Sequence, residues 1–151
     1  MEREIAFRGK SKSTGEWVDG YYVGDNTIIA YNEVVYDMGF IDTSPCHDCY
    51  PGSIGQFTGL YDKNGKEIYE GDILRGDEYP FNCDGVDNYF AEIVWADNVC
   101  GFYRLTHKNP NSTVRGISHG NWEQLDEDDI KSFEVIGNIH DNPELLKDGR
   151  D

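Results

Sequence analysis

Short runs of alternating apolar and polar residues recur along the chain, separated by turn-forming residues. The clearest of them covers residues 55–74, where an Asp-Lys-Asn-Gly turn at 62–65 separates two apolar runs. Asn-Gly between such runs is the strongest short-range signal for a β-hairpin, because both residues tolerate positive φ. The pattern therefore predicts a central hairpin around which the rest of the chain is organised.

The charges around this turn favour one register of the hairpin. A two-residue loop would place Lys63 opposite Lys66, and like charges directly opposite each other destabilise a sheet. A three-residue loop instead pairs Asp62 with Lys66 and places Gly65 in the left-handed region as a bulge. We therefore predict a positive φ at Gly65.

Much of the remaining chain also has the alternation typical of strands. Pro45 and Pro51 predict a loop over residues 42–52, and Asn142-Pro143 predicts the start of a short helix, since Asn is a good N-cap and Pro suits the first helical position. The predicted strands lie at residues 4–8, 16–23, 27–31, 33–36, 71–75, 91–95, 101–106 and 133–139.

Strands at short, regular spacing with turns between them predict an all-β fold, or a β-rich α+β fold, rather than a parallel sheet. The expected architecture is a barrel or roll with a short C-terminal helix. We divide it into an N-terminal β-rich part with the central hairpin, residues 1–70, and a second β part, residues 71–146. One intertwined domain is the alternative.

The chain is strongly acidic, with 29 acidic against 13 basic residues and a net charge of −16. Residues 76–151 carry more of this excess, with 16 acids and six bases against 13 and seven in residues 1–75. Such a charge repels phosphate backbones, which argues against direct binding to nucleic acid or to anionic membranes. The sequence also lacks an apolar run of about 20 residues or a secretory core, so we expect a cytoplasmic protein with reduced cysteines.

Five motifs stand in order along the chain. They are Phe-Arg-Gly-Lys at 7–10, Gln-Phe-Thr-Gly-Leu-Tyr-Asp-Lys-Asn-Gly at 56–65, Ile-Tyr-Glu-Gly-Asp-Ile at 68–73, Val-Ile-Gly-Asn-Ile at 135–139 and Asn-Pro-Glu at 142–144. In these motifs the chain resembles the YopX-like proteins of bacteriophages and prophages. The resemblance implies a β-rich fold with an SH3-type barrel, placed in residues 71–146, and a phage or prophage gene in a bacterial cell. It implies no enzymatic activity.

Residues 46–49, Cys-His-Asp-Cys, are a candidate metal site. Zinc sites usually need four ligands in two spaced pairs, and a second pair is missing because Cys83 and Cys100 are isolated in the sequence. A surface loop with ordinary thiols is the simpler interpretation. We therefore predict no metal and no cofactor, and keep Cys46 and Cys49 as the candidate zinc ligands.

Glu70 and Asp72 are a second candidate pair. Two carboxylates on one face of a strand can serve as an acid/base couple or as metal ligands. Gly71 between them favours a turn instead, in which the carboxylates cap backbone N–H groups. With no nucleophile–base pair and no phosphate-binding loop in the sequence, we predict that the protein is not an enzyme.

The acidic stretch after Trp122 is the main candidate interaction site. Its carboxylates include Asp126, Glu127, Asp128 and Asp129. The simpler interpretation is a solvated loop that keeps the protein soluble. The functional one is a docking surface for a basic protein, with Trp122 as its apolar anchor. Replacing the four carboxylates with amides is expected to leave folding nearly unchanged.

Together these observations predict a non-enzymatic, acidic protein-interaction module with a protein partner. The alternative is a self-assembling structural or accessory phage protein, whose sheet edges pair between subunits. A metal-binding or nucleic-acid-associated role ranks below both.

Overall fold

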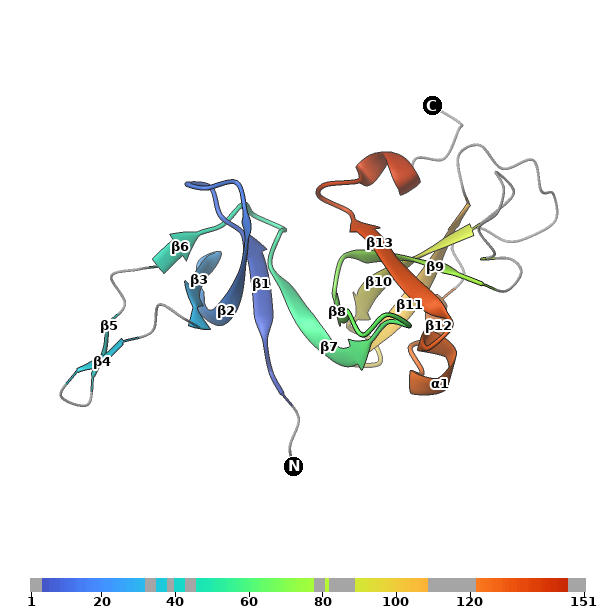
Figure 1. Ribbon diagram of the computed structural model, residues 1–151, viewed down its shortest axis with the longest axis horizontal. Coiled ribbons are helices and arrows are strands. Elements are labelled where there is room, and N and C mark those ends of the chain that lie inside the picture. The colour runs from blue at the N-terminus through green and yellow to red at the C-terminus, as the bar shows by residue number, and fades with distance from the viewer. Residues whose placement is uncertain are drawn as a thin grey trace. The chain divides into compact units, whose positions relative to one another are not determined.

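Antiparallel strands make up most of the structure, a computed structural model that describes residues 4–31, 35–37, 40–42, 46–77, 81, 89–108 and 122–146. The fold is all-β, as the spacing of the turns predicts (Figure 1). Among the described residues, no helix has the length and apolar character needed to cross a membrane. The chain divides into two compact units, Met1–Gly59 and Leu60–Asp151.

The first unit contains an antiparallel sheet with the strand order β6-β3-β2-β1-β7 (Figure 1). The predicted turn at Asp25-Asn26 joins β2 to β3, and its φ values of 48° and 58° suit the left-handed turns that match strand twist. Two further short strands, β4 and β5, pair with each other. The strands of this unit are β1 (Phe7–Lys10), β2 (Trp17–Gly24), β3 (Thr27–Ala30), β4 (Val35–Asp37), β5 (Phe40–Asp42), β6 (Cys46–Asp48) and β7 (Gly55–Tyr61).

Two glycines allow close packing in this sheet. A Cβ at Gly20 would lie 2.0 Å from the carbonyl oxygen of Ile29 on the paired strand. At Gly9, a Cβ would lie 2.7 Å from the Sγ of Cys49 and from the Cδ1 of Ile54. Gly9 of the Phe-Arg-Gly-Lys motif is therefore packed in the interior of the unit, where a side chain at this position has no room.

Residues 42–52 are not the continuous loop that the two prolines predict. β5 ends at Asp42, and β6 (Cys46–Asp48) pairs with β3, with Ile28 opposite His47. β6 is at the edge of its sheet, where a proline next to a strand is compatible with pairing. Pro45 and Pro51 flank this strand in the sequence without interrupting it.

The second unit contains a five-stranded antiparallel sheet in the order β12-β11-β10-β9-β13. β10 and β11 stay in register from Tyr89 opposite Lys108 to Ala96 opposite Gly101, which confirms the predicted pair with its turn near Asp97-Asn98. No pairing joins β12 to β13 in the described part of the chain, so closure into an SH3-type barrel stays a prediction. The strands are β8 (Glu67–Tyr69), β9 (Asp72–Gly76), β10 (Tyr89–Ala96), β11 (Gly101–Lys108), β12 (Trp122–Gln124) and β13 (Phe133–Asn138).

One face of this sheet carries the apolar core. Alternate residues of β10 point into it, and the short helix α1 (Glu127–Ile130) adds Ile130. The buried members of the core are Ile68, Leu74, Phe81, Tyr89, Ala91, Ile93, Ile130, Phe133 and Val135.

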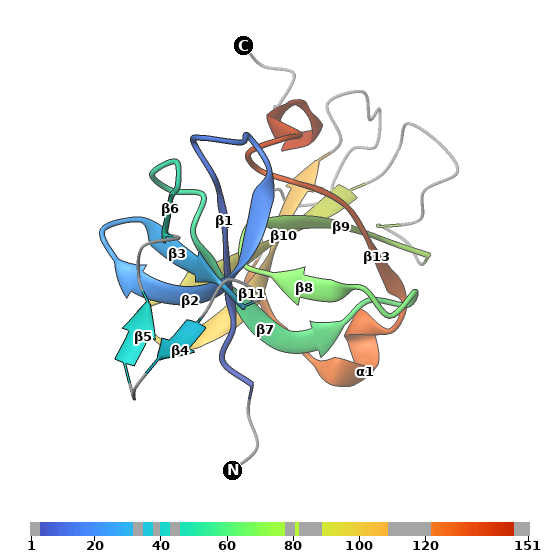
Figure 2. The same ribbon diagram turned by 60° about the vertical axis from the view of Figure 1, so that its left-hand side comes forward.

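The predicted hairpin forms with the predicted turn, at the point where β7 enters the second unit and pairs with β8 (Figure 2). The N–H of Asp62 donates to the carbonyl of Lys66 over 2.8 Å, and Gly65 has a φ of 79°. The bulged three-residue loop is therefore confirmed. The turn and β8 of this hairpin lie in the second unit, which begins at Leu60, whereas the division expected from the sequence places the whole hairpin in residues 1–70.

The Asp62 carboxylate ties the turn to a distant strand. It accepts hydrogen bonds from the backbone N–H groups of Asn64, Lys66 and Val135, at 2.8, 2.9 and 2.9 Å. Burial acts to raise the pKa of Asp62, but these three N–H donors outweigh it, so the pKa lies below its ordinary value. Lys63 adds a backbone bond to Phe133, the first residue of β13.

A β-bulge explains the broken alternation of residues 133–139. Val135 lies opposite Leu74, but Gly137 lies opposite the next residue, Ile73, so Ile136 is the extra residue. After the bulge the inward positions change, and the polar Asn138 becomes buried. Its Oδ1 accepts bonds from the N–H groups of His140 and Asp141.

The predicted helix start at Asn142-Pro143 is present, as the short 3-10 helix η2 (Pro143–Leu146). The Asn142 Oδ1 accepts a bond from the N–H of Asn138, and the N–H of Leu145 donates to the Asn142 carbonyl. Gly137 makes room for this side chain, since a Cβ there would lie 2.3 Å from the Asn142 Oδ1. The Asn-Pro-Glu motif therefore closes the end of β13.

Candidate functional site

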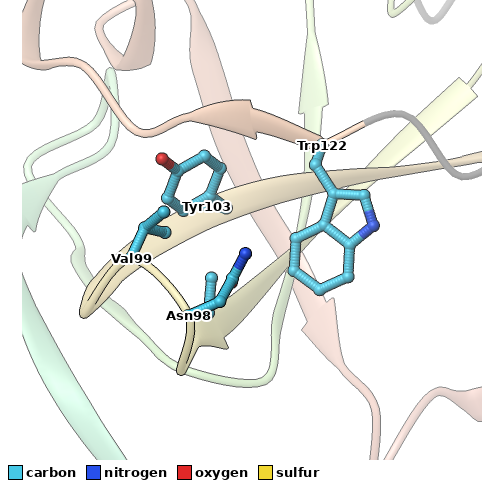
Figure 3. Close-up of a pocket in the computed structure, with 5 residues that line it drawn as sticks. Asn98, Val99, Tyr103 and Trp122 are labelled. Atoms are coloured by element: carbon cyan, nitrogen blue, oxygen red, sulfur yellow. The ribbon is translucent and has the colours of Figure 1, made fainter.

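A pocket of about 300 Å³ opens beside the edge strand β12. Trp122 and Tyr103 form two of its walls, with ring centroids 6.4 Å apart and ring planes at 59°. Register places these side chains on one face of the sheet, because Trp122 lies opposite Leu105 and Tyr103 lies two residues before it on β11. The remaining lining residues are Ala96, Asn98 and Val99 (Figure 3).

The turn between β10 and β11 completes the pocket. The N–H of Val99 donates to the carbonyl of Ala96, and Cys100 takes a φ of 51°, an uncommon value for a residue with a Cβ. Asn98 and Val99 are both exposed on this turn. The side chain of Asn98 points between Trp122 on one side and Val99 and Tyr103 on the other (Figure 3).

Trp122 is the most exposed tryptophan of the chain's described part, with 54% of its surface accessible. Trp95, in the same hairpin, packs edge-on against Phe102, with ring centroids 5.0 Å apart. That contact lies on the opposite face of the sheet, since Trp95 and Ala96 are adjacent on β10. The two tryptophans therefore differ in role, and Trp122 is the one that faces a pocket.

The acidic stretch folds into a helical turn, α1. Asp126 is the N-cap of α1, and its Oδ1 accepts a bond of 2.8 Å from the N–H of Asp128. Glu127 and Asp128 are exposed and pair with Lys131 at 3.9 and 3.2 Å. Exposed pairs of this kind contribute about 0–1 kcal/mol.

Arg104 uses two further carboxylates of this region. Its guanidinium lies 3.1 Å from Glu123 and 3.2 Å from Asp129, and it stacks over the Phe133 ring at 5.0 Å from the centroid. Arg104 is only 6% exposed, so these pairs matter more than surface pairs do. Replacing Asp129 would therefore affect folding, contrary to the expectation that all four carboxylates are dispensable.

Trp122 and Glu123 lie on opposite faces of β12. Glu123 follows Trp122 directly and lies opposite the inward-pointing Arg104, whereas Trp122 lies on the face of Tyr103. The predicted site residues therefore form two neighbouring features: the aromatic pocket and the carboxylates that include those bound to Arg104.

The two metal-ligand candidates lie in different environments. Cys46 is exposed and Cys49 is buried. Burial, with a further contribution from Asp48, raises the pKa of the Cys49 thiol, which disfavours the thiolate that metals bind. In the described ranges, no three His, Cys, Asp or Glu side chains group as metal ligands; Cys83 lies outside those ranges.

Asp72 has the capping role that the turn interpretation predicts. Its Oδ2 accepts a bond of 2.8 Å from the N–H of Tyr69, and Asp72 is buried. Residues 70 and 71 form a turn, with Gly71 at a φ of 88°. The pair with Glu70 is therefore interrupted by the turn rather than displayed on one strand.

Two pairs of polar side chains were not predicted from the sequence. The Ser11 Oγ lies 3.3 Å from the Nδ1 of His47, but Ser11 is fully buried and cannot reach a substrate. On β10 and β11, the Glu92 carboxylate lies 2.6 Å from the Nε2 of His107. Neither pair is close in sequence, and only strand register brings its members together.

Fold and site define an all-β protein with an exposed aromatic pocket at a sheet edge. The family described as YopX protein matches residues 6–147, and the chain therefore belongs to the YopX family. A crystal structure of protein EF1440 from Enterococcus faecalis is similar, with a TM-score of 0.57 and 24% identity over 95% of this chain and 99% of that one. At this identity the similarity concerns the fold alone. No curated protein matches the chain in sequence.

Proposed function

We propose that this chain is a non-enzymatic protein-interaction module of a phage or prophage, acting in the bacterial cytoplasm. The observation that carries the proposal is the half-exposed Trp122 beside a pocket of about 300 Å³. Tryptophan and tyrosine are enriched among the residues that dominate binding energy at interfaces. An indole that faces a hollow at a sheet edge is well placed to act as such an anchor.

Four buried polar residues support a non-catalytic role. Asp62 and Asp72 are occupied by backbone N–H groups, and Arg104 is held by Glu123 and Asp129. Each of these groups has a structural partner. Ser11, which has a histidine within reach, is closed to solvent.

The acidic turn complements the pocket in this proposal. Glu127 and Asp128 are exposed and, unlike Asp129, do not pair with the buried Arg104, so they are well placed to attract a basic partner over a distance. Charge of this kind speeds association more than it adds lasting affinity. The pocket then supplies the affinity, and the acidic turn supplies the association rate.

Self-assembly is the second candidate function, favoured by one observation. All three residues of the edge strand β12 are exposed, and exposed edges can pair between subunits. Sedimentation of the purified chain separates the candidates. A discrete oligomer that dissociates in the Trp122→Ala variant supports self-assembly, and a monomer supports a different partner.

The test uses two tryptophan variants of the same hairpin region. Partners are captured from bacterial lysate with the wild-type chain, and the affinity of each purified partner is then measured for all variants. Trp122→Ala is expected to weaken binding by about 30-fold, since hot-spot truncations cost about 2 kcal/mol or more. Trp95→Ala, the matched control on the opposite face, is expected to change it by less than about threefold.

Glu127→Gln with Asp128→Asn tests the steering role separately. This pair is expected to slow association and to flatten its dependence on salt, with little change in dissociation. Unchanged affinity in Trp122→Ala, with each variant folded by circular dichroism, would contradict the proposal.

A further inference from the structure

We infer that the pocket beside Trp122 takes a cationic side chain, a lysine or arginine in a basic segment of the partner. The inference rests on the function proposed above and names the chemistry of its ligand.

The walls of the pocket suit a cation. Trp122 and Tyr103 are 6.4 Å apart between centroids and inclined at 59°, so the two rings are tilted against each other rather than stacked. Aromatic faces attract a cation placed within about 6 Å of the ring centroid, and tryptophan does so most strongly. Because both rings line the pocket, a cation held in it lies close to two aromatic side chains.

The rest of the lining suits the other parts of such a side chain. Ala96 and Val99 are apolar, and lysine and arginine carry an apolar stem behind the charge. Asn98 adds an exposed amide at the rim, whose oxygen accepts hydrogen bonds from an ammonium or guanidinium group. The pocket volume of about 300 Å³ is at the small end for ligand sites, which suits one side chain better than a cofactor.

The charge distribution favours a cation over an anion. None of the five lining residues is basic, and the exposed Asp97 lies between two of them in the sequence. The nearest described arginine along β11, Arg104, faces the other side of the sheet and is held by Glu123 and Asp129. The second unit, residues 60–151, has 20 acidic and nine basic residues, so its overall field also attracts cations.

The test follows the indole N–H signal of Trp122 by NMR in the full-length chain. The probes are four pentapeptides of glycine with a central lysine, arginine, norleucine or glutamate. Norleucine has the stem of lysine without its charge, so it separates cation binding from apolar binding. The indole signals of Trp17 and Trp95 are internal references.

The lysine and arginine peptides are expected to shift the Trp122 signal and to bind about tenfold more tightly than norleucine. High salt should weaken that binding. Trp122→Ala should abolish it, and Asn98→Ala should weaken it severalfold.

Two results would overturn the inference. One is norleucine binding as tightly as lysine, and the other is no shift of Trp122 by any peptide at millimolar concentration. Both would leave the proposed interaction function standing if Trp122→Ala still releases the captured partner. Loss of the proposed function is recognised instead by a partner that binds Trp122→Ala as well as the wild type.

Discussion

Two tight turns of the second unit have similar residues and different surroundings. The turn at 62–65 reads Asp-Lys-Asn-Gly, and the turn at 97–100 reads Asp-Asn-Val-Cys. Asp62 is 6% exposed and accepts three backbone hydrogen bonds, one of them from Val135 on another strand. In the second turn all four residues are exposed. An aspartate at the start of a turn therefore joins two strands by hydrogen bonds in the turn at 62–65, whereas the turn at 97–100 exposes its side chains to solvent.

Backbone conformation separates the two turns as well. The left-handed position of the first is Gly65, with a φ of 79°, and that of the second is Cys100, with a φ of 51°. A residue with a Cβ costs roughly 1–2 kcal/mol in this region. Strain is thus stored in the turn that borders the pocket and avoided in the turn that holds the sheet.

The largest difference is expected when the aspartates are removed. Asp62→Ala should lower the free energy of unfolding by about 3 kcal/mol or more, because three N–H groups lose a charged acceptor and that of Val135 is buried. Asp97→Ala should change it by no more than about 0.5 kcal/mol. Urea unfolding followed by tryptophan fluorescence measures the unfolding free energy of both variants. Similar losses in the two would contradict the different roles of the two aspartates.

Low pH is expected to reduce the stability that the Asp62 carboxylate contributes. The folded-state pKa of Asp62 lies below the ordinary value of 3.8, so its stabilising contribution is fully present above that pH. The contribution is lost as the pH falls through the lower, folded-state pKa. The advantage of the wild type over Asp62→Asn should therefore shrink below about pH 4. A gap in unfolding free energy that stays constant down to pH 2 would contradict the role of the charge.

The smallest effects are expected at the two left-handed positions, and in opposite directions. Gly65→Ala should destabilise the chain by roughly 1–2 kcal/mol, since alanine is strained at that φ. Cys100→Gly should be neutral or stabilise it by up to about 1 kcal/mol, because glycine removes strain but adds freedom to the unfolded chain. Thermal unfolding of both variants and the wild type measures these two effects. A Cys100→Gly variant that unfolds at a lower temperature than the wild type would contradict the strain at Cys100.

Local signals in the sequence were sufficient for much of the fold. The Asn64-Gly65 turn, the Asp25-Asn26 turn and the β10–β11 pair each depend on residues close together in the chain, and each was predicted. The strand at 46–48 could not be predicted from local signals, because its partner, β3, lies about 20 residues earlier. The nearby prolines, which are a local signal, predict a loop there instead. The broken alternation after Val135 arises from a bulge, which is visible only in the pairing with β9.

The candidate site was less accessible from sequence than the fold. Trp122 stood out as an aromatic beside acids, but its pocket needs Tyr103 and Asn98, which register alone brings to it. Arg104 gave no local signal for its pairs with Glu123 and Asp129. The sequence therefore drew attention to Trp122 but did not indicate the residues that line its pocket.

The bond from Val135 to Asp62 spans 73 positions of the chain, which has a consequence for synthesis. At ribosomal rates of about 5–20 residues per second, Asp62 is added to the chain roughly 4–15 seconds before Val135. A hairpin closes in about 1–10 microseconds, so the 62–65 turn can form and dissolve many times in that interval. During those seconds the Asp62 carboxylate is hydrated, because the N–H of Val135 is not yet present to donate to it. The hairpin is stabilised by this bond only after β13 has been synthesised.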